Sequence, residues 1–180
     1  SLNGPLAAGI PGLPAGLVTL SEQYGQLPLT ATLKPAITFA RQGFAVTPRY
    51  QRMLKFRGDQ LNAEAKSVFM PEDIIPEVGT LIRQPDLADT LERIAAQGRD
   101  GFYQGETAEK MLSVVQQAGG IWQAEDLANY QLKHRTPLSG EFAGYQITTA
   151  ALPSGGGILG RISDTLWRRP SLLLLILLAP

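Results

Sequence analysis

The sequence predicts an α+β fold that is rich in helices and contains few short strands. Several segments carry apolar residues at the three- and four-residue spacing of a helix, whereas the segment 140–151 alternates as a strand does. The 180 residues include 19 Gly and 13 Pro, which predicts short elements separated by many turns. Apolar residues make up 44% of the chain, enough to form a buried core.

The predicted helices are supported by signals at their ends as well as by their spacing. Pro14 and Pro35 lie in or near first turns, where a missing N–H group is tolerated. Thr47 followed by Pro48 is typical of an N-cap and a first helical residue, and glycines follow several of the last turns. Helices are therefore predicted over residues 14–24, 30–42, 47–56, 84–97, 106–118 and 124–130.

The remaining segments are expected to form strands and turns. A short strand is predicted near Leu6–Ala8, because the density of Gly and Pro opposes a helix there. A longer strand is predicted over 140–151, and Pro153–Gly157 ends it. Residues 70–73 and 76–79 are interpreted as turns.

Composition excludes several classes of function. The 16 Lys and Arg residues balance 16 Asp and Glu residues, which opposes a nucleic-acid binder, since such proteins carry a basic excess. The absence of Cys excludes disulfides, thiolate zinc sites and a cysteine nucleophile. His134 is the one histidine, and we expect it to be a solvated side chain because a lone His lacks partner ligands. We predict no cofactor and no metal.

Other side chains that could take part in catalysis or binding are expected to have structural roles instead. The pairs Glu72–Asp73 and Glu125–Asp126 are expected at helix starts, where carboxylates complement the helix dipole. Scattered aromatic residues are expected in the core. This aromatic set is Phe44, Phe56, Phe69, Phe102 and Phe142.

The residues Pro153, Ser154, Gly155, Gly156 and Gly157 form a glycine-rich loop. They lack the Lys and the spacing of a phosphate-binding loop and the context of a dinucleotide fingerprint. Ser154 is also outside a nucleophile elbow. The loop is therefore interpreted as the turn that ends a strand.

Several separated blocks resemble the large-subunit region of the gamma-glutamyltransferases, which are also called gamma-glutamyltranspeptidases or glutathione hydrolases. Ala8–Leu17 is similar to A-x-G-x-P-G-x-x-A-G, Phe102–Ala108 to F-Y-x-G-x-x-A, and Pro153–Gly157 to P-P-S-S-G-G. No single block is specific, but the blocks follow the order of the family along the chain. The other blocks are Tyr24–Pro28, Leu33–Ile37, Ala40–Phe44, Leu87–Leu91, Gly119–Tyr130, Arg135–Pro137 and Gly144–Tyr145.

The resemblance implies part of an αββα sandwich of the N-terminal-nucleophile hydrolases. In that family a Thr released by self-cleavage begins the small subunit and attacks the γ-glutamyl amide of glutathione and related compounds, with its α-amino group available as base. Water or an acceptor amine then takes the glutamyl group. The resemblance implies no cofactor, a γ-glutamyl small molecule as substrate, and a small subunit as partner.

No residue of this chain is assigned a catalytic or substrate-binding role. Thr148 and Thr149 resemble the threonines of the nucleophile segment, but their setting predicts a strand, which suits Thr. Pro153–Gly157 is expected to lie beside the active site of a complete enzyme. We therefore expect the isolated chain to be inactive.

The resemblance extends over residues 1–158, and residues 159–180 are interpreted as a divergent, Arg- and Leu-rich tail that a frameshift would explain. Its apolar run, Leu172–Ala179, is shorter than the roughly 20 residues of a membrane span, so membrane insertion is not expected. Periplasmic or secreted localisation is implied by the family alone, since Ser1 is not followed by a signal segment.

Two alternatives remain open. The chain could be a non-enzymatic interaction module that uses exposed apolar faces or the tail of residues 159–180. It could also belong to a related acylase of the same family that cleaves a different amide, such as a β-lactam side chain.

Overall fold

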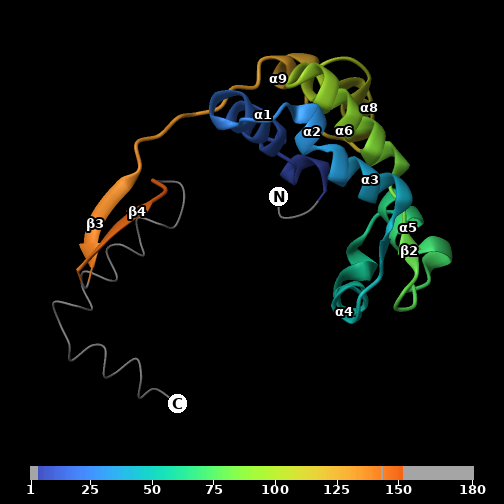
Figure 1. The fold of residues 1–180 in the computed structure, drawn as a ribbon. Coiled ribbons are helices and arrows are strands. Elements are labelled where there is room, and N and C mark those ends of the chain that lie inside the picture. Colours follow the sequence, from blue (N-terminus) through green and yellow to red (C-terminus); the bar gives the residue numbers. More distant parts are fainter. Residues whose placement is uncertain (1–3, 143, 152–180) are drawn as a thin grey trace. The chain divides into compact units, whose positions relative to one another are not determined.

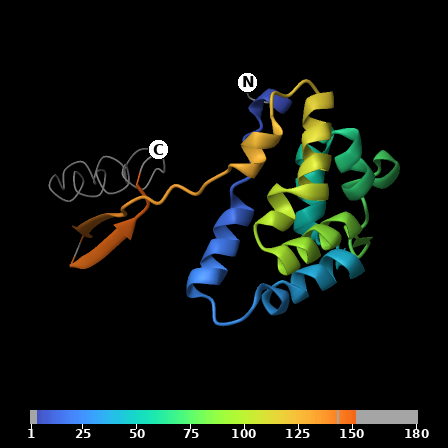
Figure 2. The same ribbon diagram turned by 90° about the horizontal axis from the view of Figure 1, so that it is seen from above.

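The computed structural model describes residues 4–142 and 144–151, which divide into two units after Leu132. Figures 1 and 2 show the first unit as an assembly of short helices. Its principal helices are α1 (Leu13–Tyr24), α2 (Leu29–Thr32), α3 (Lys34–Gln42), α4 (Pro48–Arg57), α5 (Ala63–Phe69), α6 (Pro85–Gln97), α7 (Asp100–Tyr103), α8 (Gly105–Gln117) and α9 (Ala124–Ala128). Three 3₁₀ turns accompany them in the described residues: η1 (Pro5–Ala7), η2 (Gly58–Gln60) and η3 (Pro71–Asp73).

Helix α6 is the centre of the first unit's packing. It contacts α2, α3 and α7, and α7 in turn contacts α8 (Figure 2). Gly101 permits the turn between α6 and α7, because a Cβ atom there would lie 2.3 Å from the backbone oxygen of Arg93. Any larger residue at position 101 would therefore push the two helices apart.

The core joins the N-terminal segment to the last helices of the unit. Its buried residues are Ala15, Tyr103, Ala108, Trp122 and Leu127. The indole N–H of Trp122 donates to the carbonyl of Ala8 at 3.1 Å, so this large ring is buried without an unpaired donor. The core thus depends on contacts between residues about a hundred positions apart in the sequence.

Local capping explains several helix boundaries. The Thr47 hydroxyl accepts from the Tyr50 N–H at 3.2 Å, which caps α4 as its sequence predicts. Gln123 and Asp126 form a reciprocal capping box at the start of α9. Asp126 therefore has the structural role at a helix start that its position predicts.

Two small antiparallel sheets complete the described structure. In the first unit β1 (Phe44–Ala45) pairs with β2 (Leu81–Ile82). In the second unit β3 (Leu138–Phe142) pairs with β4 (Tyr145–Thr149), with Phe142 opposite Tyr145. Gly144 has a φ of 80°, a left-handed conformation that a glycine adopts readily in such a connection.

The structure corrects three predicted elements. The strand near Leu6–Ala8 is wrong, because residues 5–7 form the turn η1. The helix over 30–42 is divided after Thr32, since Pro35 has no N–H to donate to the carbonyl four residues earlier. The strand over 140–151 is the hairpin of β3 and β4.

Two side-chain predictions are also wrong. Glu72 and Asp73 lie in η3 with positive φ values, so they do not begin an α-helix. The aromatic set does not form the buried core: Phe56 is 71% exposed, and Phe44 and Phe69 are half-buried. Phe102 is half-buried and packs against the core, and the burial of Phe142 lies outside what the structure describes. Tyr103 and Trp122 occupy the core in their place.

In the described part of the chain, no helix is both long and apolar enough to cross a membrane. The prediction of a helix-rich fold with few short strands is confirmed.

Candidate functional site

The glycine-rich loop Pro153–Gly157 lies outside the described residues, so its place beside an active site stays a prediction. Thr148 and Thr149 are described, and both belong to β4. Thr148 lies opposite Ser139, with the two hydroxyl oxygens 3.4 Å apart. These threonines are thus paired in a sheet, as their sequence setting predicts.

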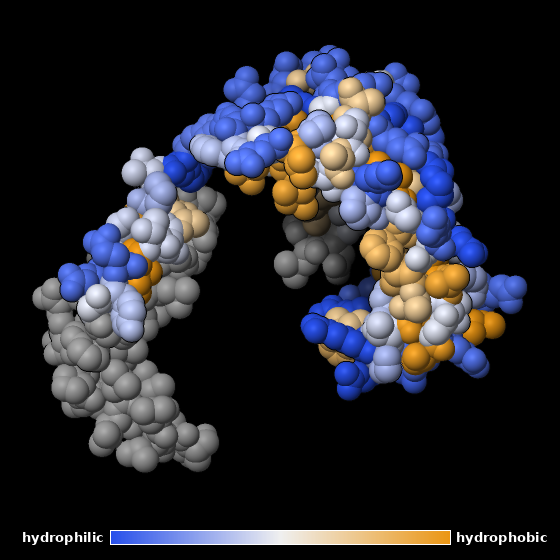
Figure 3. All heavy atoms as spheres, viewed as in Figure 1, coloured by the Kyte–Doolittle hydropathy of each residue, from blue (hydrophilic) through white to orange (hydrophobic). Residues whose placement is uncertain are grey.

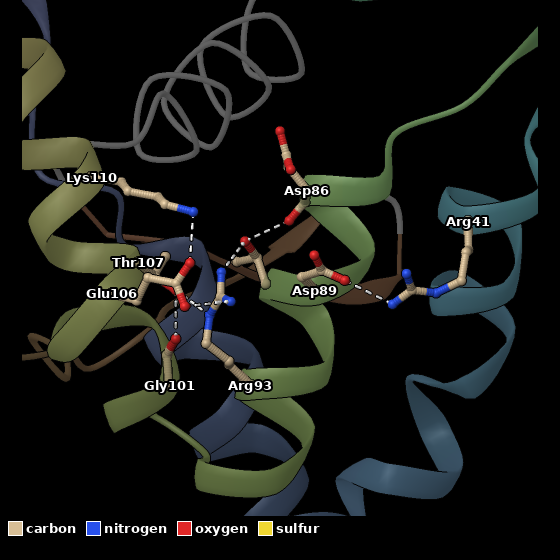
Figure 4. A network of polar contacts seen from close by, with 9 residues as sticks. Arg41, Asp86, Asp89, Arg93, Gly101, Glu106, Thr107 and Lys110 are labelled. Atoms are coloured by element: carbon tan, nitrogen blue, oxygen red, sulfur yellow. Dashed lines mark hydrogen bonds and ion pairs between the residues drawn. The ribbon is translucent and has the colours of Figure 1, made fainter.

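A cluster of polar contacts is centred on Arg93 of α6 (Figure 4). Its Nε donates to the Thr107 hydroxyl at 2.8 Å, and its Nη2 donates to the Thr90 hydroxyl at 3.2 Å. Its Nη1 lies 3.3 Å from the Glu106 carboxylate. Because Glu106 and Thr107 belong to α8, one guanidinium connects two helices.

The same cluster is closed by further bonds on α8. Thr107 is buried, and its hydroxyl donates to the Gly101 carbonyl at 3.0 Å. Lys110 pairs with Glu106 at 2.6 Å, one helical turn away. Arg93, Thr107, Glu106 and Lys110 are therefore each bonded within the cluster.

A second ionic cluster joins α6 to α3. Arg41 of α3 donates from Nη2 to Asp89 and Glu92, both at 2.8 Å. Figure 4 shows Arg41 reaching from α3 toward Asp89 on α6. This pair connects α3 with α6, and its side chains are about half exposed, so its contribution to stability is small.

The ionisation of these groups follows from their pairing. The hydrogen bond from Lys110, helped by the charge of Arg93, holds the pKa of the Glu106 carboxyl below its ordinary value. The same bond raises the pKa of Lys110. Hydrogen bonds to Glu92 and Asp89 raise the pKa of Arg41. All three shifts favour the charged forms, so these residues do not have the pKa of a general base or acid near neutrality.

A third group of polar contacts anchors the N-terminal segment. The Tyr103 hydroxyl donates to the Pro11 carbonyl at 2.5 Å and accepts from the Ala15 N–H at 3.2 Å. Burial raises the pKa of Tyr103. Its ring stacks on Tyr130 at a centroid distance of 5.4 Å, and the Arg99 guanidinium lies 4.7 Å from its centroid.

An open pocket of about 380 Å³ is lined by the end of α1, the following loop and the end of α6. Ser21, Glu22 and Leu27 are among the residues that line it. Ser21 has no histidine or lysine beside it in this lining, so its hydroxyl is not activated as a nucleophile there.

The polar contacts of Arg93, Arg41 and Tyr103 therefore position helices of the first unit. No three His, Cys, Asp or Glu side chains among the residues described could hold a metal ion. The roles of Arg93 and Tyr103 were missed from the sequence, because each depends on a partner brought close only by folding. An arginine on the polar side of an amphipathic helix gives no local signal of the side chain that it will contact on another helix.

Comparison with known proteins identifies the family. The sequence model of the gamma-glutamyltranspeptidases matches residues 1–168. The glutathione hydrolase proenzyme of Escherichia coli strain K12 is 38% identical over 161 residues, which cover 88% of this chain and 28% of that protein. The chain thus spans little more than a quarter of that relative's length.

Solved structures agree with the sequence match. Helicobacter pylori gamma-glutamyltranspeptidase matches with a TM-score of 0.81 and 37% identity, covering 86% of this chain and 45% of that chain. The cephalosporin acylase of Bacillus halodurans matches with a TM-score of 0.70 and 32% identity, covering 80% of this chain and 28% of that chain. The family model covers more of the chain than the blocks over 1–158 that carry the resemblance. The chain belongs to the gamma-glutamyltranspeptidase family.

Proposed function

We propose that this chain is the helical part of an enzyme that transfers or hydrolyses the γ-glutamyl group of glutathione and related amides. The observation that carries the proposal is the family match over residues 1–168. In this proposal the attacking group is an N-terminal Thr on a small subunit produced by self-cleavage, and the relative's name as a proenzyme supports that processing step.

The role of this chain in that enzyme is to provide a rigid scaffold. Arg93 fixes α6 to α8 and Tyr103 fixes the start of α1, and a fixed frame is what a reaction that depends on positioned groups requires. None of the described clusters pairs a hydroxyl with an available base. The isolated chain is accordingly proposed to be inactive.

The experiment is an assay of the purified 180-residue chain with a chromogenic γ-glutamyl anilide. We expect no release of the aniline above the uncatalysed rate. A matched chimera would carry the residues of this chain in place of the matching segment of the Escherichia coli relative, and we expect it to release the aniline. Turnover by the isolated chain would contradict its proposed inactivity.

A second candidate function is acylase activity on a cephalosporin side chain. This candidate rests on the 32% identity between the chain and a protein named cephalosporin acylase. Because the chimera would take its other segments from the Escherichia coli relative, it cannot report this chain's natural substrate. The natural gene, expressed with its flanking sequence, is the preparation to test on both amides, and preferential cleavage of the cephalosporin amide would favour the acylase.

Localisation in the periplasm or outside the cell is likewise proposed from the family alone. Fractionation of cells that express the natural gene, followed by detection of this chain, tests that proposal. Recovery in the cytoplasmic fraction would contradict it.

A further inference from the structure

Helix α4 has an exposed face on which arginines and large apolar side chains lie together. Arg49, Arg52, Met53 and Phe56 follow each other at intervals of three, one and three residues, which places them on one side of the helix. All four are exposed, Met53 to 54% and Phe56 to 71%. We refer to these four residues as the α4 face. Figure 3 shows strongly hydrophilic surface in the region of α4, with hydrophobic surface beside it.

The other side of α4 holds the helix on the first unit. The ring of Tyr50 packs edge-on against Phe44 at a centroid distance of 5.5 Å. The side-chain amide of Gln51 donates to the Pro76 carbonyl at 3.1 Å, and Leu54 is half-buried. The α4 face therefore lies away from the contacts that fix the helix, and its side chains are available to a partner.

The charges of α4 are all of one sign, because its sequence holds arginines and a lysine but no acidic residue. Lys55 and Arg57 lie in the last turn, where cations complement the helix dipole. Arg49 lies in the first turn, where the dipole opposes a cation, and Arg52 follows it at a spacing that brings like charges together. Among the described residues neither arginine forms an ion pair. The stability of the helix therefore gives no reason for Arg49 and Arg52.

An anionic partner would relieve this repulsion, and the mixed chemistry of the α4 face indicates which kind. Lysines and arginines beside an anionic bilayer are attracted to its headgroups, while exposed apolar side chains enter the boundary between headgroups and acyl chains. A nucleic acid is the weaker candidate, because the chain has a net charge of zero and nucleic-acid binders carry a basic excess.

We propose that the α4 face docks on the surface of a bilayer that contains anionic lipids. Arg49 and Arg52 contact headgroup phosphates, and Met53 and Phe56 enter the acyl boundary. The 10 residues of α4 are too few to cross a bilayer, so the helix lies on its surface. The proposal goes beyond the proposed function, because it requires no γ-glutamyl chemistry.

The test is flotation of the 180-residue chain with vesicles of phosphatidylglycerol and phosphatidylcholine, compared with vesicles of phosphatidylcholine alone. The cation variant carries Arg49→Gln and Arg52→Gln, and the apolar variant carries Phe56→Ser. The control variant carries Lys133→Gln and Arg135→Gln, which remove the same charge from exposed positions of the second unit. Circular dichroism of each chain establishes that helix content is unchanged.

We expect the unsubstituted chain and the control variant to bind the anionic vesicles equally, and the neutral vesicles much less. Each cation near an anionic surface strengthens binding about fivefold, so the cation variant should bind roughly 25-fold more weakly. Phe56→Ser should weaken binding on the order of tenfold, because most of that ring is available for burial. Added salt should weaken the binding of the unsubstituted chain, since it screens exposed charges.

Three results would overturn the proposal. The first is that the unsubstituted chain fails to bind the anionic vesicles, or binds the neutral ones as well. The second is equal binding by the cation variant, which would place the contact elsewhere, for example in residues 159–180. The third is full binding by the apolar variant together with release of the unsubstituted chain by heparin, which would assign the arginines to a soluble polyanion.

Discussion

The hydroxyl of Tyr103 is expected to be a principal anchor of the N-terminal segment, and Tyr103→Phe removes it with little change in volume. Ala15 is in the first turn of α1, where backbone N–H groups have no partner within the helix. The hydroxyl accepts from that N–H and donates to the Pro11 carbonyl. Removing it leaves both groups without their partner.

The magnitude follows from the burial of those two groups. The bond from Ala15 is buried, and an unsatisfied buried donor costs about 1–3 kcal/mol. The bond to Pro11 is part-buried, and a typical hydrogen bond contributes about 0.5–1.5 kcal/mol. Tyr103→Phe is therefore expected to lower the free energy of unfolding by about 1.5–4.5 kcal/mol, the sum of these two ranges.

The assay is urea unfolding of the 180-residue chain, followed by circular dichroism of its helices. Tyr24→Phe is the matched control, because Tyr24 is 78% exposed at the end of α1, the helix whose start Tyr103 anchors. Surface changes usually stay within about 0.5 kcal/mol. A loss of less than about 0.5 kcal/mol for Tyr103→Phe would refute the reasoning, since it would show that these bonds are replaced by water at no cost.

Two further changes test the packing and the electrostatics of the first unit. Gly12→Ala places a Cβ 2.2 Å from the Tyr130 hydroxyl oxygen and should destabilise the fold by about 1–3 kcal/mol. Gly16→Ala lies in open space within α1 and should stabilise the fold by about 0.5–1 kcal/mol. Equal unfolding midpoints for the two variants would contradict the close contact at Gly12. The lowered pKa of Glu106 beside Lys110 means that its contribution to stability is present above the carboxyl's unfolded pKa and is lost as pH falls through the lower folded value. Glu106→Gln should therefore flatten the acid limb of a plot of unfolding midpoint against pH, and an unchanged limb would exclude that pair as its cause.

The elements that could be predicted from the sequence are those whose signals are local. Helices α6 and α8 follow from apolar spacing and terminal glycines, and α4 follows from its Thr47 cap. The short elements α7 and β1 were missed, because four and two residues are too few to show a period. Their form is imposed by neighbours such as α6 and β2.

Side-chain roles were harder to predict than helices. Phe56 resembles a core residue in the sequence, yet it is 71% exposed on α4, a helix that has no buried residue and carries Lys55 and Arg57 in its last turn. Tyr103 gave no sign of being the core's central ring, since its partners Pro11 and Ala15 lie some ninety residues away. The place of residues 153–157 beside an active site stays a prediction from family resemblance.

The rate at which the chimera releases aniline from a γ-glutamyl anilide tests the central claim most directly. The chimera joins the residues of this chain to the segments of the Escherichia coli relative outside the match. Over the 161 matched residues the two proteins are 38% identical. The account predicts turnover, and no turnover by the isolated chain under the same conditions. A chimera that folds, as judged by circular dichroism, and yet leaves the anilide intact would contradict the claim that these helices serve as the scaffold of a γ-glutamyl enzyme.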